Sequence, residues 1–253
     1  MSKNKQQATW GGRFEGKPSD LMLQMGESVS FDSRLALYDI ECSRAHASML
    51  EKVGILNEAE LKSILAGLKT IETSIESQTF EWRTDLEDVH MNIEQALTEV
   101  SPEALKLHTA RSRNDQVSVA TRLYCRDALN QLNKQCLAVA DTCLTLAKQH
   151  EFDVLPGYTH LQRAVVSSWG MWFASFAEAF CDNASDANNN YHLVNSNPLG
   201  TAAGYGVNLE LDRDYTTQVL GFNRKQINPM YAQNSRGKIE LQVLGSFKNA
   251  LLD

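Results

Sequence analysis

Residues 107–116 read Leu-His-Thr-Ala-Arg-Ser-Arg-Asn-Asp-Gln, and they lead directly into a long segment with helical periodicity. From residue 114 to about residue 151 the chain has no glycine or proline, and its apolar side chains recur at spacings of three and four. At about 1.5 Å per residue, this helix would be longer than about 50 Å. Helices of that length are typical of long bundles, so the stretch predicts a mainly α-helical fold.

The same decapeptide is also a candidate binding site. Arg111 and Arg113 offer paired N–H donors that match the two oxygens of a carboxylate. A helix that begins near Asn114 would add backbone N–H groups and a partial positive charge, so a small polycarboxylate would fit here. In the alternative interpretation, Ser112 or Asn114 only caps the helix, and both arginines are solvated.

Helical patterns flank this segment on both sides. Residues 35–53 have helical spacing that stops at Gly54, and a second helix is expected to begin with a capping box formed by Asn57 and Glu60. A third helix is expected to open at Asp88, and further helices are expected over residues 164–195, over residues 212–220 and from residue 235 onward. All five prolines lie outside these segments and strand-like alternation is almost absent, so the fold is predicted to be nearly all-α.

The order of these segments predicts two parts. Residues 1–108 are expected to form a small N-terminal domain with an irregular, extended arm at residues 10–30, and residues 109–253 a long-helix bundle. Helices above about 50 Å cannot bury a full apolar stripe inside a small monomer, so partner helices are expected. The aromatic side chains expected in the bundle core or in a subunit interface are Trp169, Trp172, Phe173, Phe176 and Phe180.

The composition narrows the class of protein. The 253 residues are 43% hydrophobic, and their formal net charge is −7 without a basic cluster, which predicts a globular protein and argues against nucleic acid as a partner. No run of 18 apolar residues occurs and residues 1–8 are polar, so we expect neither a membrane span nor a secretion signal. We therefore expect a cytoplasmic location, in which the five scattered cysteines are reduced core residues.

Three motifs occur in the order in which one enzyme family has them. They are Trp-Gly-Gly-Arg-Phe at residues 10–14, the decapeptide at residues 107–116, and Gly-Tyr-Thr-His-Leu-Gln-Arg at residues 157–163. Together they resemble the argininosuccinate lyases, which belong to the fumarase/aspartase superfamily of cofactor-free eliminases. The resemblance extends over nearly the whole chain. It implies a bundle of the fumarase/aspartase type, no cofactor, and a homotetramer whose active sites each combine segments of three subunits.

The resemblance also implies a reaction and its residues. The reaction is the cleavage of argininosuccinate to arginine and fumarate, the last step of arginine biosynthesis. His160 would be the catalytic histidine, acting together with Thr159. The residues expected to contact the substrate are Ser28, Asp88, His90, Arg113, Asn114, Thr159, Gln162 and Arg236. No metal is expected, because His90, His108 and His160 have no metal-ligand spacing among themselves.

The chemistry of this elimination fits those residue types. A weakly acidic proton is removed next to a carboxylate, so fixed donors must stabilise the doubly charged aci-carboxylate, and a base and an acid must act on two sides. Arg113 and Asn114 can supply donors, and His160 can exchange a proton near neutral pH. The structural alternatives are a turn serine at Ser28, a merely hydrogen-bonded His90 and a structural His160.

The sequence departs from the family pattern in places. The Gly-Ser-Ser-x-Met-Pro-x-Lys motif, on the loop that carries the presumed carbon-directed base, does not occur before Asp253. We therefore expect a truncated chain with little activity by itself. Val165 and Val166 stand where the family commonly has Gln-Pro, which leaves the released amine open. The alternatives are a sister eliminase that acts on another succinyl-amine, on malate or on aspartate, and a non-catalytic structural protein on the same scaffold.

Overall fold

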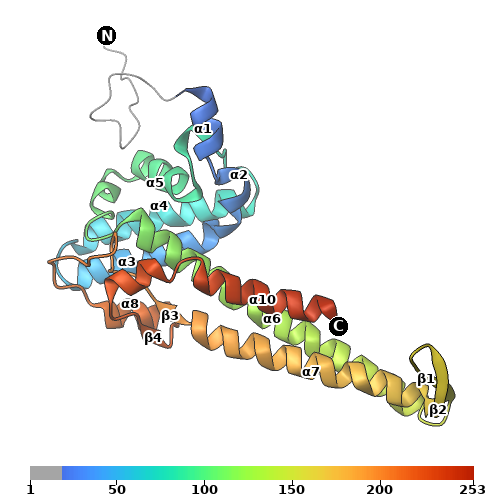
Figure 1. Cartoon of the computed structure of the whole chain (residues 1–253). Coiled ribbons are helices and arrows are strands. Elements are labelled where there is room, and N and C mark those ends of the chain that lie inside the picture. Colours follow the sequence, from blue (N-terminus) through green and yellow to red (C-terminus); the bar gives the residue numbers. More distant parts are fainter. Residues whose placement is uncertain (1–18) are drawn as a thin grey trace.

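The computed structural model describes residues 19–253, and the described part is mainly helical (Figure 1). The motif at residues 10–14 lies outside the described residues. The first part of the chain packs several helices together, whereas the second part extends as a rod of helices that lie side by side (Figure 1). This is the mainly α architecture that the sequence predicts.

The first part consists of five α-helices and three 3-10 helices among the described residues. The α-helices are α1 (Asp20–Gly26), α2 (Val29–Asp32), α3 (Ala36–Lys52), α4 (Glu58–Glu76) and α5 (Val89–Val100), and the 3-10 helices are η1 (Ser33–Leu35), η2 (Thr84–Leu86) and η3 (Pro102–Lys106). The predicted stop of α3 and the predicted starts of α4 and α5 are confirmed. Gly54 follows α3 with a φ of 79°, Asn57 and Glu60 form the capping box of α4, and Asp88 caps α5 by accepting from the Met91 N–H.

The rod consists of three helices. They are α6 (Arg113–Gln149), α7 (Trp169–Val194) and α10 (Lys238–Leu252), and they lie side by side in Figure 1. The predicted long helix is confirmed, since α6 has 37 residues and is therefore about 54 Å long. Apolar residues of all three helices form one core, which includes Leu129, Ala187 and Val243.

A compact segment joins α7 to α10. It contains β3 (Ser196–Asn197), α8 (Arg213–Val219), β4 (Arg224–Lys225) and α9 (Pro229–Asn234), and β3 pairs in parallel with β4. The predicted short helix over residues 212–220 is confirmed by α8. A core that combines Cys42 of α3, Val119 and Leu123 of α6, and Leu199 and Phe222 of this segment holds the start of α6 against the first part of the chain.

Two local expectations are wrong. Residues 19–30, expected to be irregular, contain α1 and the start of α2, because Ser19 accepts from the Met22 N–H and thereby caps α1. Residues 164–168, expected to begin a helix, lie in a strand. The β-hairpin of β1 (Val154–Thr159) and β2 (Gln162–Ser168) connects α6 to α7, and its β-branched Val165 and Val166 favour the extended backbone.

Large apolar side chains are exposed along the rod. The expected aromatic cluster is present on α7, where the Trp172 ring packs against those of Trp169 at 5.5 Å and Phe176 at 4.9 Å between centroids. Trp169 and Trp172 do not lie in the core of this chain, since they are 41% and 45% exposed, whereas Phe180 packs against the core of the three rod helices. The expectation of core packing is therefore confirmed for Phe180 and wrong for the two tryptophans.

The five cysteines differ in their burial. All five are free; Cys42, Cys125 and Cys136 are buried, whereas Cys143 is half-buried and Cys181 is exposed. The prediction that they are core residues is therefore wrong for Cys143 and Cys181.

Among residues 19–253, none of the helices is both long enough and apolar enough to span a bilayer.

We expect substitution of Gly170 to destabilise the junction between α6 and α7. A Cβ at this position would lie 2.6 Å from the Ala147 carbonyl oxygen and 2.7 Å from the Glu151 Cα, which are backbone atoms that cannot rotate away. Gly170→Ala is expected to lower the free energy of unfolding by about 1–3 kcal/mol. Gly245→Ala is the matched control, because its Cβ would meet nothing within 4 Å and alanine favours the helix by about 0.5–1 kcal/mol. Urea denaturation of both variants checks the opposite signs.

The ion pair between Arg44 and Glu72 predicts acid sensitivity. Hydrogen bonds from Arg44 at 2.8 and 2.9 Å and from Lys69 at 2.6 Å lower the pKa of Glu72 to about 2. The stabilisation is therefore present above the unfolded pKa of about 4.5 and is lost as the pH falls towards 2. We expect Glu72→Gln to cost about 1 kcal/mol at pH 7 and almost nothing near pH 2, as measured by denaturation at both values. An equal cost at both pH values would contradict this assignment.

Candidate functional site

The first turn of α6 is fixed by a capping box. Ser112 accepts from the Asn114 N–H, and the Asp115 carboxylate accepts from the Ser112 N–H at 2.9 Å. The second oxygen of Asp115 accepts from the N–H groups of Gly200 at 3.0 Å and Ala202 at 2.8 Å. Asp115 therefore joins the start of α6 to the glycine-containing loop of residues 197–206, although burial raises the pKa of its carboxyl.

The two arginines of the decapeptide have different surroundings. Arg111 is buried, and its Nη1 donates to Ser43 Oγ and Gln116 Oε1, both at 3.1 Å. Arg113 is half-buried, and its Nη1 donates to Glu87 at 2.8 Å and Asp88 at 3.1 Å. The capping interpretation is thus correct for Ser112 but wrong in predicting two solvated arginines. The expectation of two open guanidinium donors is also wrong for Arg111, which is held inside the fold.

Arg236 contacts the start of α6 through Asn114. Its Nη1 donates to Asn114 Oδ1 at 3.0 Å, across 122 positions of sequence. Asn114 Nδ2 in turn donates to Ser112 Oγ at 3.3 Å, and both Asn114 and Arg236 are exposed. The structure therefore brings an amide and a guanidinium together at the start of α6, where the helix adds a partial positive charge.

Ser28 and Asp88 lie near Arg113, the residue that precedes Asn114 in the chain. Ser28 donates its backbone N–H to the Glu87 carbonyl at 2.7 Å and its hydroxyl to Asp32 at 2.7 Å. Asp88 caps α5 with one carboxylate oxygen and accepts from Arg113 with the other. Glu87 thus joins Ser28 to Arg113, and Arg113 also contacts Asp88. The next residue in the chain, Asn114, contacts Arg236.

His90 lies deeper than the other predicted residues. It is only 1% exposed, and its Nδ1 lies 3.1 Å from Asp39 Oδ1. Gln116 donates to the same Asp39 oxygen at 2.8 Å. His90 is therefore oriented by a buried carboxylate and does not face open solvent.

Thr159, His160 and Gln162 lie at the far end of the rod. Thr159 pairs with Gln162, and His160 and Leu161 form the two-residue loop of the hairpin with positive φ values of 49° and 61°. All three predicted residues are exposed. Figure 1 shows the hairpin at the opposite end of α6 from the first part of the chain. Within one chain, a small molecule cannot contact both Asn114 and His160, because α6 separates them by about 50 Å.

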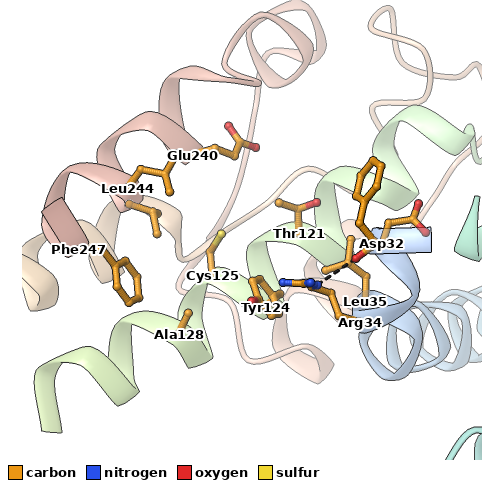
Figure 2. Close-up of a pocket in the computed structure, with 12 residues that line it drawn as sticks. Asp32, Arg34, Leu35, Thr121, Tyr124, Cys125, Ala128, Glu240, Leu244 and Phe247 are labelled. Atoms are coloured by element: carbon orange, nitrogen blue, oxygen red, sulfur yellow. Dashed lines mark hydrogen bonds between the residues drawn. The ribbon is translucent and has the colours of Figure 1, made fainter. Parts of the chain in front are cut away.

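A groove beside α6 is lined mainly by apolar atoms, unlike the polar cluster around Arg113 and Asn114. It has a volume of about 600 Å³ and lies between α6, α10 and the segment of α2 and η1, where Tyr124, Leu244 and Phe247 line it (Figure 2). Its lining surface is mostly apolar, and Arg34 there donates to the Phe31 carbonyl oxygen at 2.9 Å. Because convergent donors are lacking along its lining, the groove suits an apolar ligand or helix better than a dicarboxylate.

Sequence reasoning missed several residues of this region. Asp115 was not singled out, although a serine followed three positions later by a carboxylate predicts a capping box. Asp39 and Glu87 gave no comparable signal, because their roles depend on contacts with residues 51 and 26 positions away.

Three comparisons bear on the fold and the site. The model of the lyase family matches residues 12–239. The chain is 49% identical to an argininosuccinate lyase of Xylella fastidiosa (strain 9a5c) over 228 residues, which is 90% of this chain and 51% of that protein. It is also 49% identical to an argininosuccinate lyase of Stenotrophomonas maltophilia (strain R551-3), over 90% of this chain and 53% of that protein.

A solved structure supports the same fold. A variant of EDDS lyase with bound fumarate superposes with a TM-score of 0.77 at 24% sequence identity, and the match covers 92% of this chain and 46% of that one. The chain thus spans about half the length of the curated relatives that it matches.

Proposed function

The chain belongs to the lyase family, and on this premise we propose that the protein cleaves argininosuccinate to arginine and fumarate. The observation that carries the proposal is the 49% identity to argininosuccinate lyases over 90% of the chain. The three sequence motifs that resemble this family support it independently of the geometry.

We propose that the cluster at the start of α6 binds the succinate part of the substrate. Asn114 and Arg236 place an amide and a guanidinium within one hydrogen bond of each other, next to the helix N-terminus. These are the donors that an aci-carboxylate needs, because its second negative charge develops on the carboxylate oxygens during proton removal. Arg113 supports the cluster through Glu87 and Asp88, and those carboxylates raise the pKa of its guanidinium against the opposing effect of burial.

His160 and Thr159 would then act from a neighbouring copy. The exposed hairpin carries both side chains, and the separation of about 50 Å excludes a joint role with Asn114 in one chain. A homotetramer with shared sites satisfies this geometry and covers the exposed apolar side chains of α7. Gln162, paired with Thr159 at the same tip, would contact the same substrate.

A substrate panel tests the reaction. The assembled full-length protein, which includes the loop absent before Asp253, is incubated with argininosuccinate, adenylosuccinate, malate and aspartate, and fumarate is followed by its ultraviolet absorbance. We expect turnover of argininosuccinate with equimolar arginine. Fumarate release from another substrate alone would identify a sister eliminase, and binding without turnover of any substrate would favour a non-catalytic protein.

Mixed assemblies test the sharing of sites. Chains with Asn114→Ala and chains with His160→Asn are denatured together and refolded, and the activity is compared with that of each variant refolded alone. Because an oligomer of both chains contains some sites with neither substitution, we expect the mixture to regain part of the activity. No recovery in a mixture shown to contain both chains would contradict shared sites.

We also propose a cytoplasmic location. All five cysteines are free thiols, and three of them are buried, which fits a reducing compartment.

A further inference from the structure

Three side chains that can ligate a metal converge beside the start of α6. They are His90 and Glu94, one helical turn apart on α5, and His108, which lies between η3 and α6. One ligand atom of each lies within 4.8 Å of those of the other two. We propose that these residues bind a transition-metal dication of the Zn²⁺ class, a function that goes beyond the lyase reaction and does not depend on it.

The distances suit such an ion. His90 Nε2 lies 3.5 Å from one Glu94 oxygen, and His108 Nδ1 lies 3.4 Å from the other. Around a tetrahedral Zn²⁺ with bonds of about 2.0–2.2 Å, neighbouring ligand atoms are about 3.3–3.6 Å apart. The two contacts are to different oxygens of Glu94, and the three ligand atoms lie within 4.8 Å of one another. The His108 side chain, which is 46% exposed, has room to rotate towards a shared ion.

The buried nitrogen of His90 points to a ligand. Among residues 19–253, His90 Nε2 has no hydrogen-bond partner although it is buried, and leaving such a group unsatisfied costs about 1–3 kcal/mol. Its other nitrogen faces Asp39, which also accepts from Gln116. A carboxylate behind a ligating histidine is the usual arrangement that fixes the ring and increases its basicity.

The local charge also favours a dication. Glu94 supplies a carboxylate to the ion, and Asp39 places a second one behind His90. Arg111 opposes them with one positive charge, but its Nη1 is directed to Ser43 and Gln116. Three protein ligands leave the fourth position of a tetrahedral ion for water, and the exposed His108 side provides the entry path.

This proposal differs from the expectation of no metal site. Among spacings, that expectation compared histidines with one another, whereas the pair that matters here is His90 and Glu94 at i and i+4, which face the same side of a helix. The third ligand, His108, cannot be assigned from spacing, because the turn after η3 brings it back to α5.

Cobalt binding tests the proposal. The purified protein is stripped of metal with EDTA and titrated with Co²⁺, whose visible absorption bands report coordination by nitrogen and oxygen in a tetrahedral or five-coordinate site. We expect one Co²⁺ per chain, displacement by Zn²⁺, and a rise in Tm on metal binding. Absence of such bands, together with an unchanged Tm, would overturn the proposal.

Variants at the accessible side of the cluster assign the ligands. Glu94→Gln and His108→Ala are preferred to changes at the buried His90, and each is expected to weaken Co²⁺ binding at least tenfold and to remove the rise in Tm. Asp39→Asn is expected to weaken binding roughly 10- to 100-fold while the absorption bands persist. His150→Ala is the matched control, because His150 pairs with Asp153 at 2.6 Å on the surface without a third ligand. Equal affinities in the control and in both ligand variants would show that the cluster is not the site.

Discussion

Replacement of His160 by asparagine is expected to lower kcat for argininosuccinate cleavage roughly 10²- to 10⁴-fold, the range that a general acid or base contributes. The reason is that His160 presents the only imidazole on the hairpin of residues 154–168, and its side chain is exposed at the tip. Asparagine tolerates the positive φ of 49° at this position, so the turn and the pairing of Thr159 with Gln162 are retained. Steady-state kinetics on the assembled enzyme measure the loss.

A second histidine provides the control. His150 lies just beyond the C-terminus of α6, outside the hairpin, and its Nδ1 contacts Asp153. His150→Asn is expected to keep kcat within about twofold of the unsubstituted protein. If His160→Asn also retained kcat within about fivefold in a correctly assembled oligomer, the assignment of His160 as the acid/base group would be wrong.

Removal of the Asp115 carboxylate is expected to have the largest effect on stability. Asp115→Ala leaves the N–H groups of Ser112, Gly200 and Ala202 without their acceptor, and the carboxylate that joined them is fully buried. Because each unsatisfied buried N–H costs about 1–3 kcal/mol, we expect a loss of about 3–5 kcal/mol in the free energy of unfolding. Urea denaturation measures this loss, and hydrogen exchange is expected to accelerate at Gly200 and Ala202.

Asp127, on the same helix, provides a control that distinguishes the loss of these buried hydrogen bonds from the loss of one negative charge. Asp127 is exposed and accepts a single hydrogen bond, from the Tyr38 hydroxyl at 2.9 Å. Asp127→Ala is therefore expected to cost less than about 1 kcal/mol. Similar costs for both variants, or unchanged exchange at Gly200 and Ala202 in Asp115→Ala, would mean that Asp115 does not hold the loop.

Local signals predicted most of the helices. The capping box of Asn57 and Glu60, the cap at Asp88 and the glycine at Gly54 act within a few residues of the boundaries that they set. The hairpin was missed because a two-residue loop usually contains glycine or asparagine, whereas here His160 and Leu161 adopt positive φ values.

The candidate site was predictable by residue type but not by arrangement. Sequence motifs indicated Arg113, Asn114 and His160, yet nothing in their spacing places Arg236 against Asn114 or buries Arg111. The contact of Arg236 depends on how the segment of residues 195–237 returns to the start of α6, whereas Arg111 is held by Ser43 of α3 and by Gln116. Such long-range packing is decided by the whole core and leaves no local pattern in the sequence.

Because α6 is one unbroken helix, the number of its residues is constrained more strictly than their identities. Each residue added to a helix advances everything beyond it by about 1.5 Å and turns it by about 100° around the axis. A single residue inserted into α6 would therefore rotate the hairpin by about a quarter of a turn relative to the start of the helix. Most single substitutions on the outer surface of α6 would leave this orientation unchanged. A compensating deletion elsewhere in α6 would restore the angular register.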